Sequence, residues 1–217
     1  MTINVNRFFL LCLVLLLGAV FSSHALAQAQ SARQQLEHFS DGMETFRARF
    51  EQQVISTDGM VQDGSSGQVW LRRPQLFRWS YGGEYPELVV ADGKNIWIYD
   101  EMLEQVTVKS QSEAAANSPL MLLTDLAQLD EQFEVREVGE VDGAQLLELR
   151  SRSAETEFDR ILLGLRDNSL HLMVMEDAFG LRTELKFHDV EKNPQLESGL
   201  FTFQPPESAD VIGEIQR

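Results

Sequence analysis

The chain has 217 residues, of which 34 are acidic and 18 are basic, so its formal net charge at pH 7 is −16. Nucleic acids and anionic lipid surfaces repel such an acidic protein, which argues against binding to either of them. Solubility is one explanation of the charge, and attraction to a basic partner surface is the alternative. The length suits one domain with a sizeable hydrophobic core.

The first 27 residues have the pattern of a secretory signal peptide. Arg7 supplies the positive charge, residues 8–20 form an almost continuous apolar run, and Ala25 and Ala27 mark a cleavage site. The run is too short for a transmembrane anchor. We therefore expect cleavage after Ala27, which leaves residues 28–217 as a single domain. The removed segment carries one basic residue and no acidic one, so the mature net charge becomes −17.

The only cysteine, Cys12, lies inside the apolar run of the signal peptide. The mature chain then has no thiol for lipid attachment or for a disulfide. We expect it to be unanchored and stabilised by packing alone.

The mature chain begins with a predicted helix and a predicted strand. Residues 31–41 carry an apolar stripe at helical spacing, and Gly42 is a plausible stop. Met43, Phe46, Phe50 and Val54 fit a helical stripe, but Phe46, Ala48, Phe50 and Val54 also alternate as in a strand. Gly42 favours a helix before it and a strand after it. Residues 56–66 contain Asp-Gly twice, which predicts a turn or a flexible loop.

Residues 67–79 alternate, with the more apolar side chains at odd positions. Successive side chains of a strand point to opposite faces, so these residues share one face. Arg73 falls in the middle of this apolar face, and Pro74 removes a hydrogen-bond donor, which indicates a strand edge or a bulge. A buried guanidinium is costly unless its donors are paired. The apolar members of the face are Val69, Leu71, Phe77 and Trp79.

Short segments follow, and a second helix interrupts them. Residues 88–91 and 96–99 predict a hairpin across Asp-Gly-Lys-Asn, with another strand at 105–109 and a loop at 110–117. Ser118 and Pro119 are typical of a helix start, and this helix reaches about Gln128.

The remaining chain predicts strands at residues 133–138, 144–150, 158–165, 170–176 and 181–190, with residues 200–206 closing the domain. One apolar and one polar face per strand indicates an antiparallel sheet with one side in water. A sheet of this size curls or closes. Two short helices are too few to cover its apolar face, so we expect part of that face to line a cavity.

The residue patterns of enzymes are absent from the sequence. His38, His171 and His188 lack metal-ligand spacing, and there is no phosphate-binding loop and no nucleophile elbow. We therefore predict no enzymatic activity, no metal and no cofactor. The chain is rich in methionine, phenylalanine and leucine, which suits the binding of acyl chains; ordinary core filling is the alternative.

Three motifs occur in order along the middle of the chain. They are Gly-x-Val-Trp-Leu-x-Arg-Pro-x-Leu-Phe-Arg-Trp at 67–79, Val-Ala-Asp-Gly-Lys-x-Ile-Trp-Ile-Tyr-Asp at 90–100, and Leu-Glu-Gln-Val-Thr-Val at 103–108. Together with residues 46–52, 117–119 and 201–206, they resemble LolA, the family of periplasmic outer-membrane lipoprotein carriers. The resemblance spans essentially the whole mature chain.

The resemblance implies an α+β, mainly β fold: an unclosed antiparallel β-barrel whose apolar concave face is covered by a lid of short helices. It also implies a periplasmic carrier that takes acylated lipoproteins from a LolCDE-type ABC transporter of the inner membrane. A LolB-type acceptor on the outer membrane then receives them. We expect a monomer.

In this family, the arginine of the Arg-Pro-x-Leu-Phe motif holds the lid closed by hydrogen bonds to lid backbone, and this role carries over to Arg73. We expect its partners to be backbone carbonyls of the helices at 31–41 or 118–129; a plain salt bridge to a neighbouring strand is the alternative. The residues predicted to line the cavity are Phe46, Phe50, Val69, Leu71, Phe77, Trp79, Leu120, Met121 and Leu123.

A similar fold is compatible with other functions. A LolB-like protein is disfavoured because it requires a lipidated cysteine. A periplasmic binding protein for free lipid and a lipid-sensing regulatory module are the alternatives to a lipoprotein carrier.

Overall fold

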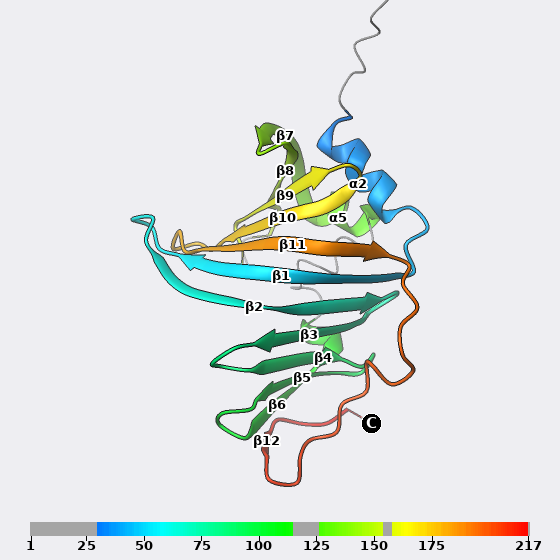
Figure 1. Cartoon of the computed structure of the whole chain (residues 1–217), viewed down its shortest axis with the longest axis vertical. Helices are drawn as coiled ribbons and strands as arrows, with labels where there is room; N and C mark the ends of the chain where they lie inside the picture. The colour runs from blue at the N-terminus through cyan, green and yellow to red at the C-terminus, as the bar shows by residue number, and fades with distance from the viewer. Residues whose placement is uncertain (1–29, 115–125, 154–157, 217) are drawn as a thin grey trace, which may run out of the picture.

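The computed structural model describes residues 30–114, 126–153 and 158–216. These residues form one twelve-stranded sheet and three short helices (Figure 1). The helices are α2 (Ala32–Ser40), α3 (Gln111–Ala114) and α5 (Leu126–Gln132). The strands are β1 (Thr45–Ile55), β2 (Val61–Arg72), β3 (Leu76–Gly82), β4 (Glu87–Ala91), β5 (Asn95–Asp100), β6 (Gln105–Ser110), β7 (Phe133–Val141), β8 (Ala144–Ser151), β9 (Arg160–Arg166), β10 (Ser169–Glu176), β11 (Arg182–Lys192) and β12 (Asp210–Ile212).

The sheet is open and almost entirely antiparallel. Its order is β12-β6-β5-β4-β3-β2-β1-β11-β10-β9-β8-β7, so β12 and β7 are its two edges. The predicted mainly β, unclosed architecture is confirmed. The sheet is antiparallel as predicted except at one edge, where β12 pairs in parallel with β6. β12 has only three residues, too few for a recognisable alternation.

Helix α2 begins and ends close to where the sequence predicts it. Ser31 caps its first turn: the Ser31 hydroxyl accepts from the Gln34 amide, and the Gln34 side chain accepts from the Ser31 amide. Such a reciprocal pair satisfies two donors that the helix itself leaves free. Leu36 and Phe39 are fully buried, so the predicted apolar stripe faces the sheet.

The largest differences from the predicted boundaries are three. Residues 61–66 belong to β2 rather than to a loop, because Asp63 and Gly64 pair with Val54 and Gln53 across the long β1–β2 hairpin. Cross-strand pairing overrides the turn preference of these residues. Part of the predicted loop at 110–117 is the short helix α3, and α5 extends four residues beyond the predicted end of the second helix. The predicted start of that helix lies outside the described residues.

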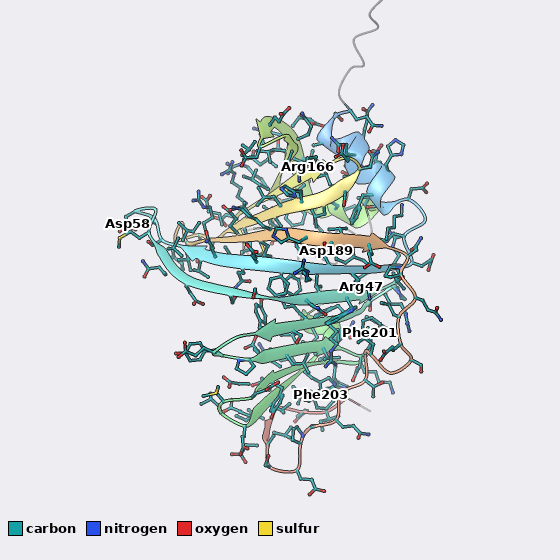
Figure 2. The ribbon with its side chains drawn as sticks, viewed as in Figure 1. Arg47, Asp58, Arg166, Asp189, Phe201 and Phe203 are labelled. Atoms are coloured by element: carbon teal, nitrogen blue, oxygen red, sulfur yellow. The ribbon has the colours of Figure 1, made fainter. Side chains whose placement is uncertain are left out.

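The largest apolar cluster lies on one face of β1, β2 and β8–β11, which we call the inner face. Phe46, Ala48 and Phe50 of β1 contribute to it, together with side chains from α2 and α5. The opposite, outer face of β1 and β11 is polar: Arg47 pairs with Glu191, and Arg49 pairs with Asp189 (Figure 2). These strands therefore follow the predicted alternation.

The outer face of β4–β6 is also apolar, contrary to the predicted single buried face. Its cluster consists of Leu88, Val90, Trp97, Val106 and Val108. The C-terminal residues 199–216, which we call the strap, run along this face and bring Phe203 against it (Figures 1 and 2). The prediction of a water-facing outer side is wrong for β4–β6, because the strap that covers it is distant from these strands in sequence.

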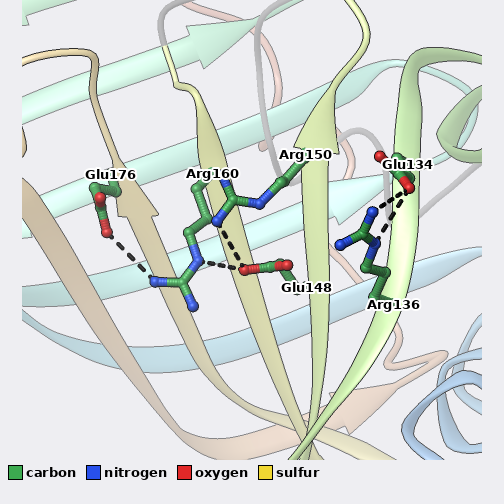
Figure 3. Close-up of polar contacts among 6 residues, drawn as sticks. All are labelled: Glu134, Arg136, Glu148, Arg150, Arg160 and Glu176. Carbon is green, nitrogen blue, oxygen red and sulfur yellow. Dashed lines mark hydrogen bonds and ion pairs between the residues drawn. The ribbon is translucent and has the colours of Figure 1, made fainter.

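A row of charges crosses the outer face of β7–β10. The buried carboxylate of Glu148 accepts from Arg160 at 2.6 Å and from Arg150 at 3.3 Å, and Arg160 also reaches Glu176 (Figure 3). Burial raises the pKa of the Glu148 carboxyl, but hydrogen bonds from Arg160 and Arg150 outweigh it and bring that pKa below its ordinary value. Glu148 is therefore ionised at neutral pH and ties β8 to β9.

Candidate functional site

Arg73 lies in the turn between β2 and β3. Residues 67–79 are a hairpin and not one strand, so Arg73 sits at the rim of the sheet and not in the middle of an apolar face, which corrects the sequence-based placement. Strand pairing sets Leu71 opposite Phe77 and Val69 opposite Trp79. The turn thus keeps the predicted residues on one face although the strand reverses.

The inner face beneath this turn is densely packed. Val69 is 0% and Leu71 is 2% exposed, and both belong to the same cluster as Phe46 and Phe50. The Phe50 ring lies 4.7 Å from that of Trp79, measured between centroids. This is the distance at which aromatic rings attract each other beyond their burial.

Gly67 makes this aromatic packing possible. A Cβ atom at this position would lie 2.0 Å from the Ser80 carbonyl oxygen and 2.8 Å from Cζ of Phe50. Only glycine fits where the Phe50 ring crosses β2. The Phe50 ring also meets Tyr81, with 5.2 Å between centroids.

Tyr81 is a polar group at the end of the apolar cluster and was not among the predicted site residues. Its hydroxyl donates to Oε1 of Gln52 at 3.2 Å. Burial, together with the charge of Glu87, raises the pKa of Tyr81 to about 12. The alternation of residues 67–79 continues to position 81, so extending the pattern by two residues would have found it.

The other predicted lining residues are placed differently. Phe77 shares the inner side of its hairpin but packs in a separate cluster with Ala91 and Ile96. Leu120, Met121 and Leu123 lie outside the described residues.

Side chains of α2 and α5, which we call the lid, fill the space over the inner face. Leu36 and Phe39 of α2 and Leu129 of α5 are at most 2% exposed and belong to the main cluster. The Phe39 ring meets that of Phe46 edge-on at 5.9 Å. The apolar face is therefore occupied by the lid, and an apolar ligand on it has to displace lid side chains.

Arg73 joins the sheet rim to this lid. Its Nη2 donates to the backbone carbonyl of Ser40, the last residue of α2, at 3.1 Å, and its own amide donates to the Glu44 carbonyl at 2.9 Å. The Nε atom of Arg73 is buried and finds no hydrogen-bond partner within the described part of the chain. A guanidinium has five donors, so this contact to α2 leaves the group incompletely paired.

Two surface cavities flank the apolar cluster. One, of about 590 Å³, lies beside Arg73 and is lined by Glu37, His38, Ser40, Asp41, Gly42 and Leu126. The other, of about 660 Å³, lies beyond Tyr81 and is lined largely by polar and acidic side chains, among them Glu51, Gln52, Asp63 and Glu87. Both ends of the apolar cluster thus meet polar surroundings.

Residues 41–204 match the family described as outer membrane lipoprotein carrier protein LolA. The chain belongs to this family. A LolA-family protein of Xanthomonas campestris, named outer-membrane lipoprotein carrier protein, is 38% identical over 200 residues, which is 91% of this chain and 94% of that protein. The protein of the same name from Xylella fastidiosa is 40% identical over 84% of this chain and 88% of its own length. The predicted family is confirmed.

The fold is also found in a solved structure. An uncharacterized conserved protein of Thermus thermophilus superposes with a TM-score of 0.56 at 17% identity, covering 84% of this chain and 99% of that one. At this identity the likeness concerns the fold alone.

Family membership confirms the predicted carrier function and its non-enzymatic character. Two observations on the described residues stand beside it. They contain no cluster of three or more His, Cys, Asp or Glu side chains arranged to hold a metal ion. Their helices are too short or too polar to cross a bilayer.

Proposed function

We propose that this LolA-family chain carries the acyl chains of lipoproteins across the periplasm on its inner face. It receives them from a LolCDE-type transporter in the inner membrane and delivers them to a LolB-type acceptor on the outer membrane. The family match over most of the chain, joined to an apolar sheet face under a helical lid, supports this proposal.

Transfer through water requires a carrier for energetic reasons. Each buried methylene is worth about 0.8 kcal/mol, so an acyl chain of about fifteen carbons resists water by on the order of 10 kcal/mol. The inner face offers apolar surface to an acyl chain once Leu36, Phe39 and Leu129 move away from it. Loading exchanges lid side chains for acyl chains, so much of the gain is offset and release stays feasible.

Arg73 sets the balance between the closed and the loaded state. Its hydrogen bond to the Ser40 carbonyl is made while α2 covers the sheet. A contact present in only one of two states shifts the population toward that state. Arg73 therefore favours the closed, empty lid and lowers the apparent affinity for cargo, which promotes delivery to the acceptor.

The Arg73→Leu variant tests this latch. We expect it to load as well as the wild type and to release cargo to the acceptor about tenfold more slowly, which corresponds to a loss of about 1.4 kcal/mol in closed-state preference. The measurement is the rate of cargo transfer from purified, loaded carrier to purified acceptor. Arg73→Lys, which keeps the charge without the guanidinium fork, should be intermediate. Unchanged transfer by Arg73→Leu would contradict the latch.

The identity of the cargo tests the function itself. Intact protein isolated from the periplasm of its own host should carry acylated protein, detected by mass spectrometry after mild extraction. Free lipid in place of acylated protein would instead favour a lipid-binding role.

A further inference from the structure

The two ends of α2 are attached to the rest of the molecule in different ways. At its C-terminal end the chain runs directly into β1, and Lys192 donates to the His38 carbonyl at 3.0 Å. Arg73 contacts the same end through Ser40. Within the described residues, the other end is connected to the sheet only through the helix itself. Side-chain contacts therefore decide whether that end stays closed.

Glu137 of β7 holds the N-terminal end of α2. Its Oε2 accepts from the Ala32 amide and its Oε1 from the Arg33 amide, both at 3.0 Å. First-turn amides have no acceptor within their own helix, and the positive end of the helix dipole favours a carboxylate there. Since β7 is an edge strand, Glu137 ties this helix end to the edge of the sheet.

Arg33 joins α2 to α5. Its Nη1 and Nη2 donate to the two carboxylate oxygens of Asp130 at 2.6 and 2.8 Å, and its Nε donates to Glu37 at 2.9 Å. The hydrogen bond from Arg33 holds the pKa of Asp130 below its ordinary value. A bidentate pair fixes the relative orientation of its two partners as well as their distance. The two lid helices are thereby joined to each other at the end opposite Arg73.

We propose that Glu137, Arg33 and Asp130 form a second latch, which holds the N-terminal end of α2 against the sheet edge and against α5. Loading requires α2 to leave Glu137 as well as to break the Arg73 contact, while the Arg33–Asp130 pair is kept. Because Arg33 links the two helices, α2 and α5 leave the inner face together. This inference rests on the carrier function proposed above and adds the residues that position the lid.

The second latch differs from Arg73 in its response to salt. The side chains of Arg33 and Asp130 are 28% and 50% exposed, so mobile ions screen their attraction. Arg73 contacts a neutral carbonyl from a partly buried position, where screening is weaker. Salt therefore distinguishes the opening of one latch from the opening of the other.

The Asp130→Asn variant tests the second latch in the unloaded, full-length mature protein. We expect the amides of α2 to exchange hydrogen about fivefold faster than in the wild type at low salt. This factor corresponds to a loss of about 1 kcal/mol in the free energy of opening α2. Mass spectrometry of peptides covering α2 measures this. Asp130→Glu should restore slow exchange. At about 1 M salt, where the Debye length is about 3 Å, the difference between wild type and Asp130→Asn should shrink.

A matched control uses another exposed arginine–carboxylate pair. Glu191→Gln removes the partner of Arg47 on the outer face, where Nη2 lies 2.6 and 2.7 Å from the two carboxylate oxygens. This change should leave exchange in α2 unaltered. Unaltered exchange in Asp130→Asn, or equal acceleration throughout the sheet, would overturn the second latch.

Joint movement of the two helices has its own test. In Arg73→Leu, amide hydrogen exchange should accelerate by the same factor in α2 and in α5, relative to the wild type. In the double variant Arg73→Leu with Asp130→Asn, α2 and α5 should accelerate by different factors. Equal factors in both proteins would show that Arg33 does not couple the helices. None of these measurements needs cargo, so their failure is distinct from a failure of the carrier function.

Discussion

The lid and the strap both cover an apolar face of the same sheet, but they are attached by different means. The lid is held over the inner face by side chains, chiefly Arg73 at one end and Glu137 at the other. The strap is joined to β6 by backbone pairing through β12, and the side chain of Asn95 exchanges two hydrogen bonds with the Gln216 backbone. Contacts made by side chains suit a cover that opens, whereas backbone pairing suits one that stays.

Arg72 and Arg73 are adjacent in sequence, but they contact different covers. Arg72 points to the outer face, where its guanidinium lies 5.1 Å from the centre of the Phe201 ring in the strap. Arg73 reaches the lid through Ser40. One arginine therefore serves the permanent cover and its neighbour serves the movable one.

The largest effect is expected from Phe39→Ala in the lid. Phe39 is 2% exposed, and its loss should lower the free energy of unfolding by about 3 kcal/mol. The same change weakens the closed lid, so cargo release to the acceptor should slow by roughly tenfold. Urea unfolding and transfer rates measure the two effects. A less stable variant with normal release would mean that Phe39 serves the core alone.

The corresponding change in the strap is Phe203→Ala. Phe203 lies 5.7 Å from Trp97 and 5.8 Å from Tyr99 between ring centroids. Because it is only partly buried, we expect a loss of about 2 kcal/mol in the free energy of unfolding. Release should remain at the wild-type rate in the native protein. Slower release would show that the strap also moves during transfer.

The smallest effect is expected from Arg72→Gln. A half-buried cation–π contact contributes about 1 kcal/mol, so the free energy of unfolding should fall by about this amount, with no change in release. Thermal unfolding and the transfer assay provide the comparison with Arg73→Leu. Similar release defects in the two variants would remove the distinction between the two covers.

Local patterns in the sequence determined much of the fold and part of the site. The alternation around Val69 and Trp79 placed both on one face, and the apolar stripe of α2 with Gly42 after it located the first helix, because these signals depend only on neighbouring residues. The family motifs singled out Arg73, because a motif is also a pattern of neighbouring residues.

Long-range packing decided the rest. Arg33 and Asp130 are 97 positions apart, and the contact between Arg73 and Ser40 spans 33. Phe77 follows the alternation of Val69 but packs with Ala91 and Ile96 instead, because the neighbouring strands and not its own sequence set its environment. The strap covers a face that the sequence assigned to water. Periodicity fixes the face on which a side chain lies; only the tertiary structure decides what meets it there.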